Sequence, residues 1–361
     1  MILKRIIRVY FIIGQVFGAW FSPIISGCLM LVLRILVGFF RLLDYVFYPE
    51  LLKPIKNEPI IIVGNPRSGT TFLHRFLIKL NLGSGSQLWQ MIYPSIILQK
   101  IIKPVLPIME AISPARHHST AAHKTSLTGI ETDDVSLLFR YFDGFFLYGF
   151  FLTFDKNNLF DWVDPKIRDT SNRDYKWFTS MWKRNLISNK HDQYIGKLFS
   201  LSGNLPEFQK RFPNSKILYM IRDPLNLIPS GLSLVTGVLD KKFNFWSLDE
   251  EVKKRFIKRL YNALVQLLNR FQDDWVKGNI NKKNIYLVNF DTMMNDFETL
   301  MHEILEFIDA EKKQNLTEII QKTAKNQKAY KSKHKYELSK FGLSEQQIRK
   351  DCINYYKTFL K

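Results

Sequence analysis

The segment from Ile60 to Leu80 constrains the fold more than any other part of this chain. It starts with the aliphatic run IIIV, continues through the glycine-containing turn GNPRSGTT, and then places apolar residues at helical spacing. A short β-branched run that ends in glycine predicts a buried strand, and the residues from Thr70 onward predict an amphipathic helix closed by Asn81 and Gly83. Strand, glycine loop and helix together are typical of α/β proteins.

Three further strands are predicted, at 193–200, 216–221 and 284–290, and they are separated by helical stretches, the longest at 248–276. This alternation favours a P-loop-like, mainly parallel sheet flanked by helices on both faces. We therefore expect an α/β domain at 56–361 that follows an apolar helical segment at 1–55. Within the domain we expect an insertion on the acceptor side at 84–191 and a basic C-terminal segment at 322–361.

The N-terminal segment is nearly free of charge over residues 10–33, with basic residues on both flanks. That stretch exceeds the roughly 20 residues needed to span or enter a bilayer. Pro23 near its middle also allows a kinked or re-entrant hairpin, and the remaining alternative is a pair of apolar helices packed on the domain. The segment predicts membrane association, either at the cytoplasmic face of a bacterial inner membrane or through a Golgi-type anchor.

The net charge of +19 predicts contact with an anion: a polyphosphate-like ligand, an acidic membrane, a sulfated or phosphorylated acceptor, or nucleic acid. Only Cys28 and Cys352 are present, far apart and outside any CxxC pattern, so neither a disulfide framework nor a zinc site is indicated. Two apolar pieces of the insertion, 91–109 and 135–154, predict core helices or else an acceptor pocket or membrane-facing lid.

The loop from Gly64 to Gly69 has the G-x-x-x-x-G spacing of an ATP-binding loop, but Thr70 stands where such a loop has lysine. Backbone N–H groups in this turn and the following helix N-terminus favour a phosphate. The lysine that would reach the β and γ phosphates is missing, and Arg67 places the positive charge earlier in the loop. These features favour a ligand with a single 5′-phosphate group.

The run PRSGTTF, Pro66 to Phe72, resembles the 5′-phosphosulfate loop of sulfotransferases that use 3′-phosphoadenosine 5′-phosphosulfate. The resemblance is to the broad bacterial-type family and extends from Pro59 to the C-terminus, where YELSKFGL is similar to the family's Y-x-L-x-x-F-G-L tail. It implies that this nucleotide is the sulfuryl donor and that no metal is needed. The loop residues implied to bind the donor are Arg67, Ser68, Gly69, Thr70, Thr71 and Phe72.

A second element of the family holds the 3′-phosphate, and the matching residues here are Arg222 and Ser230, after the predicted strand at 216–221. A planar guanidinium suits bidentate phosphate binding. The alternative is that R-D-P forms only a turn with a helix cap. The resemblance also implies that Lys197 stabilises the transferring group or the leaving phosphate, and that the basic tail closes over the adenosine and 3′-phosphate.

The general base is expected in the acidic cluster of GIETDDVSLL, with Glu131 first and Asp133 or Asp134 next, because clustered buried carboxylates raise one another's pKa. The alternative is a helix cap formed by Thr128 or Thr132 with the neighbouring acids. Other branches of the family use histidine, so the histidines of ARHHSTAAHK are further candidates, although the pattern favours a polar loop of solvated histidines; they are His117, His118 and His123.

Taken together, these features predict a sulfotransferase that moves a sulfuryl group to a hydroxyl or amine of a small-molecule, lipid or glycan acceptor near a membrane. No nucleic-acid partner is expected. Two alternatives remain: a P-loop kinase, disfavoured by Thr70, and a non-enzymatic basic protein that binds anions, nucleic acid or membranes, suggested only by the net charge.

Overall fold

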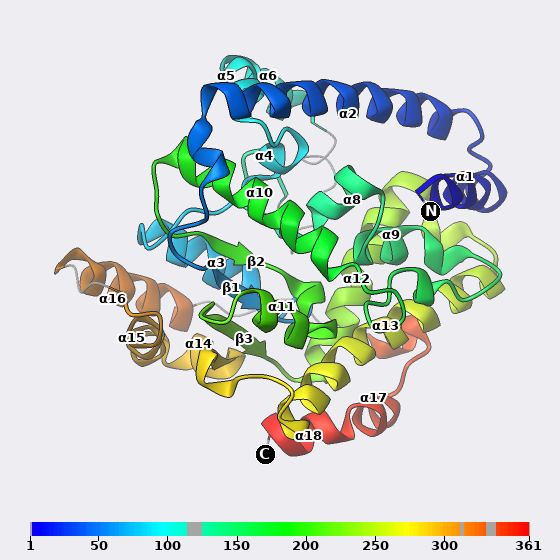
Figure 1. Ribbon diagram of the computed structural model, residues 1–361. Helices are drawn as coiled ribbons and strands as arrows, with labels where there is room; N and C mark the ends of the chain where they lie inside the picture. Colours follow the sequence, from blue (N-terminus) through cyan, green and yellow to red (C-terminus); the bar gives the residue numbers. More distant parts are fainter. Residues whose placement is uncertain (1, 114–124, 311–313, 330–336, 361) are drawn as a thin grey trace. The chain divides into compact units, whose positions relative to one another are not determined.

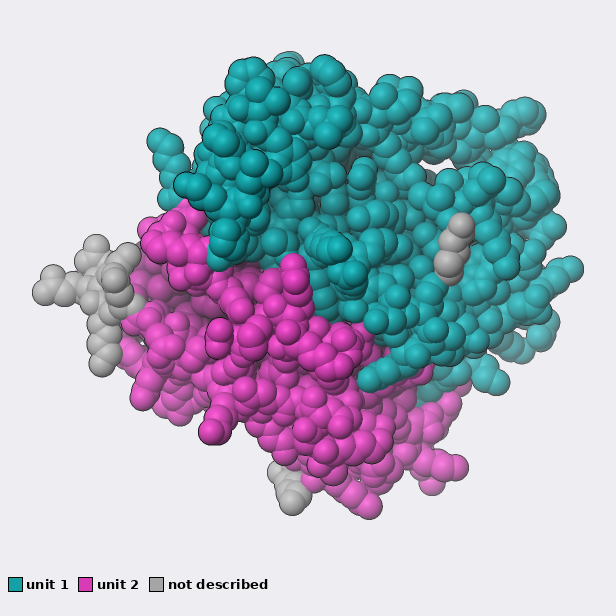
Figure 2. Space-filling model, viewed as in Figure 1, with its two compact units in different colours: residues 1–55, 86–190, 232–263 teal, residues 56–85, 191–231, 264–361 magenta. Residues whose placement is uncertain are grey.

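The computed structural model describes residues 2–113, 125–310, 314–329 and 337–360 (Figure 1). The chain forms two compact units (Figure 2). One comprises residues 1–55, 86–190 and 232–263, and we call it the helical unit; the other comprises 56–85, 191–231 and 264–361, and we call it the sheet unit. Helices α12 (Pro224–Phe243) and α13 (Glu250–Lys277) each begin in one unit and end in the other.

The sheet unit contains four parallel strands in the order β2-β1-β3-β4. Their bounds are β1 (Ile60–Val63), β2 (Ile195–Lys197), β3 (Ile217–Ile221) and β4 (Ile285–Asn289). All four coincide with predicted strands, and the predicted parallel α/β sheet is confirmed. The predicted helices after Thr70 and over 248–276 are also confirmed, as α3 (Thr70–Lys79) and α13.

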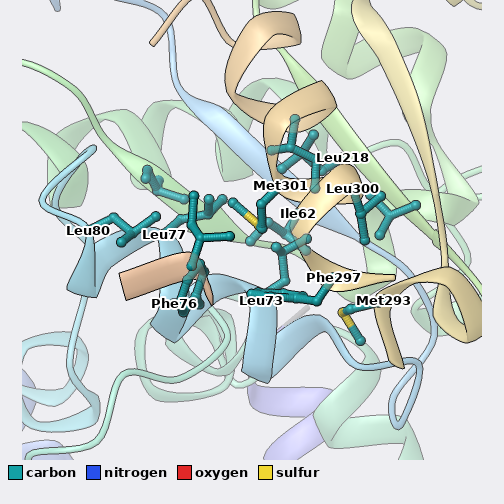
Figure 3. Close-up of a cluster of buried hydrophobic side chains, with 14 of the residues drawn as sticks. Ile62, Leu73, Phe76, Leu77, Leu80, Leu218, Met293, Phe297, Leu300 and Met301 are labelled. Atoms are coloured by element: carbon teal, nitrogen blue, oxygen red, sulfur yellow. The ribbon is translucent and has the colours of Figure 1, made fainter. Parts of the chain in front are cut away.

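Helices cover both faces of the sheet within this unit. The core cluster contains Ile62 and Leu218 from the strands and Leu73 from α3, together with residues of α15 (Phe297–Phe307) and α16 (Gln314–Ala329) (Figure 3). On the other face Tyr219 stacks on Phe271 of α13, with ring centroids 3.3 Å apart. The unit's remaining helices are α11 (Leu205–Arg211), α14 (Phe290–Asn295), α17 (Glu345–Asp351) and α18 (Ile353–Phe359).

The helical unit combines short helices with three longer ones, α1, α2 and α10, of 16, 26 and 19 residues. Its elements are α1 (Ile2–Phe17), α2 (Ser22–Phe47), α4 (Leu88–Ile92), α5 (Ile96–Ile102), α6 (Leu106–Ile112), α8 (Val135–Tyr141), α9 (Phe145–Phe150) and α10 (Ser171–Asn189). Leu147, Leu152 and Phe154 are almost fully buried, so the apolar piece at 135–154 provides core. The piece at 91–109 differs, because Ile101, Val105 and Ile108 are exposed.

The apolar stretch at 10–33 does not form one helix. The chain breaks between α1 and α2, where Gly18 has a φ of 66°, and Pro23 lies in the first turn of α2. Helix α2 then continues past Arg34 and Arg41, which the sequence pattern treated as the flank of the apolar stretch, to Phe47. Among the described residues α2 is the one helix that is long and apolar enough to cross a membrane.

Candidate active site

The glycine loop joins β1 to α3 in the sheet unit and has an unusual backbone. Gly64, Arg67 and Gly69 have φ values of 149°, 77° and 96°. A positive φ is uncommon for a residue with a side chain, and such strain persists only where surrounding contacts hold it. One such contact comes from the buried Asn65, whose amide Nδ2 donates to the carbonyl of Leu264 at 2.8 Å.

Both glycines of the motif are favoured by their positive φ, and Gly64 is also required by space. A Cβ on Gly64 would lie 2.8 Å from the Cβ of Met220 and from Oγ of Ser68, and one on Gly69 would lie 2.6 Å from Cε of Met293. Helix α3 starts directly after Gly69, so its first N–H groups lack partners within the helix and carry a partial positive charge. The loop therefore has the backbone of an anion-binding turn.

Arg67 and Arg222 connect this loop to the end of β3. Nε of Arg67 donates to Oγ of Ser230 at 3.0 Å, and Arg222 donates from Nη1 to the carbonyl oxygen of Arg67. The guanidinium of Arg222 also lies 4.0 Å from the ring centroid of Phe290, which directly follows β4. The structure thus brings the two predicted phosphate-binding elements together.

Asp223 fixes the turn after Arg222. Its Oδ1 accepts hydrogen bonds from the N–H of Leu225 at 2.9 Å, in the first turn of α12, and from the hydroxyl of Tyr356 at 2.5 Å. The cap alternative for R-D-P is thus correct for Asp223. It does not account for Arg222, whose side chain points to the loop carbonyl instead.

Lys197 ends β2 beside the start of α3. It is 5% exposed, and its Nζ donates to Oγ1 of Thr71 at 3.0 Å. One turn further along α3, Nε2 of the buried His74 lies 2.8 Å from the carbonyl oxygen of Ile195. Burial, followed by the charge of Lys197, lowers the pKa of His74 to about 3, so its imidazole is neutral and donates this hydrogen bond.

The other loop residues differ in what their side chains contact. Ser68 is fully buried, and its Oγ has no hydrogen-bond partner among the described residues. Such an atom is costly unless a ligand or water satisfies it. Thr70 is also buried. The ring of Phe72 packs on those of Phe76 and Phe297, at 6.1 and 5.5 Å between centroids, so this side chain belongs to the core as well as to the predicted donor site.

The acidic cluster lies in the helical unit, before α8. Glu131, Asp133 and Asp134 are 6%, 0% and 3% exposed. The N–H of Glu131 bonds to the carbonyl of Ser86 at 3.3 Å, which anchors its backbone. Buried carboxyl groups require polar or charged partners, and three of them adjacent in sequence are uncommon.

Neither Thr128 nor Thr132 stands at the N-cap of α8. The residue at the N-cap of α8 is Asp134, which makes no side-chain capping bond. Thr132 donates its hydroxyl to Oδ2 of Asp134 at 2.6 Å, and Thr128 donates to Glu110 at 3.2 Å. The role of Glu131 as base stays a prediction. His117, His118 and His123 lie outside the described residues, as do Lys331, Lys333 and Lys335 of the basic tail.

The described residues contain no group of histidine, cysteine and carboxylate side chains that could hold a metal ion. The cationic groups at the loop are instead Arg67, Lys197 and Arg222, all carried by the sheet unit. They lie at or beside the carboxyl ends of parallel strands, where ligands bind in open α/β sheets.

A model of the sulfotransferase family matches residues 59–314. The chain belongs to the sulfotransferase family. It is accordingly a transferase, and the matched region includes the loop, Lys197, the Arg222 element and the acidic cluster. A search of curated protein sequences gave no match.

Solved sulfotransferases share the fold at low sequence identity. The chain is similar to sulfotransferase STF1 from Mycobacterium tuberculosis H37Rv, with a TM-score of 0.71 and 14% identity over 97% of this chain and 90% of that one. It is also similar to sulfotransferase STF9 from Mycobacterium avium, with a TM-score of 0.66 and 18% identity over 87% and 80% of the two chains. At these identities the likeness establishes the fold, and the fold agrees with the family assignment.

Sequence reasoning missed three residues of this candidate site: Asn65, His74 and Phe290. Lys197 and Arg222 were identified through the family resemblance, whereas Phe290 could have been identified by its position, because it ends a predicted parallel strand and directly follows β4. Asn65 and His74 gave no such signal, since their partners are backbone carbonyls far along the chain.

Proposed function

We propose that this sulfotransferase transfers the sulfuryl group of 3′-phosphoadenosine 5′-phosphosulfate to a hydroxyl or amine of its acceptor. The loop from Arg67 to Phe72 would hold the 5′-phosphosulfate, and Arg222 with Ser230 would hold the 3′-phosphate. In the reaction a bond forms between sulfur and the acceptor atom, the bond from sulfur to the 5′-phosphate oxygen breaks, and the acceptor proton passes to a base.

The observation that best supports this donor is that Arg67 forms hydrogen bonds through both its side chain and its backbone carbonyl. Its side chain bonds to Ser230 and its carbonyl oxygen accepts from Arg222, so residues proposed for the 5′ and 3′ groups form one hydrogen-bonded set. A nucleotide with separate 5′ and 3′ anions would contact both the glycine loop and the pair Arg222 and Ser230. The buried, unsatisfied hydroxyl of Ser68 and the close space around both glycines fit an anion lying against the backbone.

The chain's own residues supply the charge that sulfuryl transfer requires. Lys197 is held by Thr71 beside the start of α3, so its ammonium can stabilise negative charge that develops on the transferring and leaving oxygens. Neutral His74 adds no positive charge there. For the proton, Glu131 is our first choice of base, followed by Asp133 or Asp134.

A P-loop kinase is the enzymatic alternative. It requires a lysine after Gly69 for the β and γ phosphates, and Thr70 occupies that position. The hydroxyl of Thr71, which would bind Mg²⁺ in such a loop, accepts a hydrogen bond from Nζ of Lys197 here. A triphosphate donor is therefore the weaker proposal.

For the acceptor, we propose a small molecule, lipid or glycan, encountered near a membrane. In the most apolar 18-residue stretch of helix α2, only 6% is buried inside the protein, and this supports a location near lipid. The cytoplasmic face of a bacterial inner membrane and a Golgi-type anchor both agree with it.

Calorimetric titration with 3′,5′-diphosphoadenosine tests the donor. We expect micromolar or tighter binding, reduced about 10- to 100-fold in Arg67→Ala and Arg222→Ala, since hydrogen bonds to charged groups contribute about 1.5–3 kcal/mol. Arg211→Ala, at the exposed end of α11, is the matched control and should bind normally. Absence of binding to the wild-type chain contradicts the proposal. ATP turnover with Mg²⁺ supports the kinase, and binding that depends on salt but not on Arg67 supports a general polyanion binder.

The acceptor class can be found by comparing cells that express the wild-type chain with cells that express Arg67→Ala. A sulfated product is heavier by the mass of one sulfuryl group, and we expect such products only with the wild-type chain. Partitioning of the shifted species into organic or aqueous extracts separates a lipid acceptor from a soluble one.

A further inference from the structure

The charged residues of α2 all turn toward the helical unit. Arg34, Val37, Arg41 and Asp44 follow one another at spacings of three and four residues, so they share one side of the helix. Val37 and Asp44 are buried, and Arg34 and Arg41 are partly buried. No charged side chain of α2, all of whose residues are described, is exposed.

Asp44 is the main attachment on this side. Its carboxylate accepts from Nε of Arg184 in α10 at 2.7 Å, and both side chains are buried. It also accepts from Oγ of Ser95 at 3.0 Å and from the N–H groups of Ile96 and Ile97 at 3.2 and 3.1 Å, in the first turn of α5. A buried carboxylate with this many donors is fully compensated, so it holds α2 on α5 and α10.

Two arginines extend the attachment along the helix. Nε of Arg34 donates to the carbonyl of Phe139 at 3.1 Å. Arg41 donates to Oγ of Ser180 at 2.9 Å, and its guanidinium lies 4.6 Å from the ring centroid of Trp177. From Arg34 to Asp44 the helix is thus fixed to the unit over about 15 Å, at 1.5 Å per residue.

The outward side of the same helix is apolar. The exposed large apolar residues of α2 are Ile24, Ile25, Leu29, Leu31, Val32, Ile35, Leu36, Phe39, Leu42, Tyr45, Val46 and Phe47. The turn before α2 adds the exposed rings of Trp20 and Phe21. Ile101 in the last turn of α5, which Asp44 joins to α2, is also exposed, and so are Val105, Ile108 and Ile112 after that helix. Exposed apolar residues gathered in this number along one helix are typical of an interaction or membrane surface.

This arrangement inverts the pattern of a helix on a water-soluble protein, whose apolar stripe faces the core and whose charges face water. Charges turned to the protein and apolar groups turned outward are the pattern of helices in contact with lipid. The exposed aromatic rings at the turn suit the interface between headgroups and hydrocarbon. The chain's net charge of +19 complements an anionic membrane surface.

We propose that α2 is a monotopic anchor, which lies along the surface of an anionic bilayer with its apolar side in the lipid and does not cross it. At 26 residues, about 39 Å, the helix is long enough to span. Crossing would break the contacts of Arg34, Arg41 and Asp44 with α8, α10 and the first turn of α5, or draw these elements into the hydrocarbon. The anchor does not depend on the proposed donor, because no residue of the glycine loop takes part.

Flotation of the purified full-length chain with vesicles tests the anchor in the absence of nucleotide. The probes are vesicles of phosphatidylcholine alone and of phosphatidylcholine mixed with phosphatidylglycerol. We expect binding to both, stronger to the mixture. The triple variant Leu31→Ser, Ile35→Ser and Leu42→Ser should lose binding at least about 100-fold, since each change removes buried apolar surface. The double variant Val276→Ser and Ile353→Ser also changes exposed apolar residues, and it should bind as the wild type does.

Labelling with a reagent added outside sealed vesicles distinguishes a helix that lies on the membrane from one that crosses it. In a Cys28→Ser background, Gln15→Cys and Lys53→Cys place single accessible thiols before and after α2, since Cys352 is buried. Both should react with a membrane-impermeant maleimide on bound protein. Protection of one of them means that α2 spans, and overturns the proposal. If the wild-type chain does not bind vesicles but forms a dimer, and the triple variant is a monomer, then a second copy of the chain covers the apolar surface. That outcome also overturns the proposal.

Discussion

Nε of Arg67 and Oγ of Ser230 lie 3.0 Å apart and join the glycine loop to helix α12. The two residues are far apart in the sequence, and their contact depends on β1 and β3 being neighbours in the sheet. Because Arg67 has a positive φ, the bond also helps to hold a strained backbone in place.

A double-mutant cycle measures this contact. Ser230→Ala removes the acceptor of Arg67, and we expect affinity for 3′,5′-diphosphoadenosine to fall about 3- to 10-fold, the effect of losing a hydrogen bond of about 0.5–1.5 kcal/mol. Combined with Arg67→Ala, the losses should be less than additive, because either change alone breaks the same contact. Ser233→Ala, one turn along α12, is the control. Strictly additive losses would show that the two side chains act independently.

Replacing Lys197 is expected to lower turnover much more than nucleotide affinity. Lys197→Met keeps the apolar stem in its buried site and removes the ammonium that bonds Thr71. We expect kcat to fall about 100-fold, as when one preorganised donor is removed from a site of developing charge, with a much smaller loss of 3′,5′-diphosphoadenosine affinity.

The matched control for Lys197 is Lys210→Met, because Lys210 is an exposed lysine in α11. Its kinetic constants should be those of the wild type. A loss of 3′,5′-diphosphoadenosine affinity with unchanged kcat in Lys197→Met would assign Lys197 to donor binding alone.

Glu131 predicts loss of turnover with binding intact. Glu131→Gln keeps size and removes the group proposed to take the acceptor proton, so we expect turnover to fall at least about 100-fold. Affinity for 3′,5′-diphosphoadenosine should be unchanged. Asp133→Asn and Asp134→Asn are measured in parallel, and normal turnover in Glu131→Gln with loss in either of these moves the role of base to the affected residue.

The sheet and most of the site followed from the sequence for one physical reason. Each strand is a short aliphatic run, and in a parallel sheet the residues after the strands gather at one edge. Gly64 follows β1, Lys197 ends β2, Arg222 follows β3 and Phe290 follows β4. Local patterns were therefore sufficient to place the strands and the loop, the family resemblance singled out Lys197 and Arg222, and its position at the end of a strand could have added Phe290.

Features that depend on partners far along the chain could not be predicted from the sequence. Asn65 bonds to a carbonyl 199 positions away, and His74 to one 121 positions away, so neither shows a local signal. The extent of α2 was not evident from the sequence, because Arg34 and Arg41 flank the uncharged stretch at 10–33. Their partners in α8 and α10, which allow the helix to continue, are visible only in the fold.

His74 predicts a specific loss of stability in acid. Its pKa is lowered to about 3 in the folded chain by burial, with the charge of Lys197 adding to the effect, whereas the unfolded chain has the ordinary value near 6.5. Above about pH 6.5 the imidazole is neutral in both states and imposes no penalty. As the pH falls toward 3, only the unfolded state gains the proton, so the free energy of unfolding declines over this window.

His74→Gln keeps a side-chain N–H donor and cannot titrate. Denaturant titrations between pH 7 and pH 4 should therefore show a shallower decline for His74→Gln than for the wild type, whereas His302→Gln, on the exposed side of α15, should keep the wild-type slope. Parallel curves for His74→Gln and the wild type would mean that the buried imidazole does not control this part of the acid sensitivity.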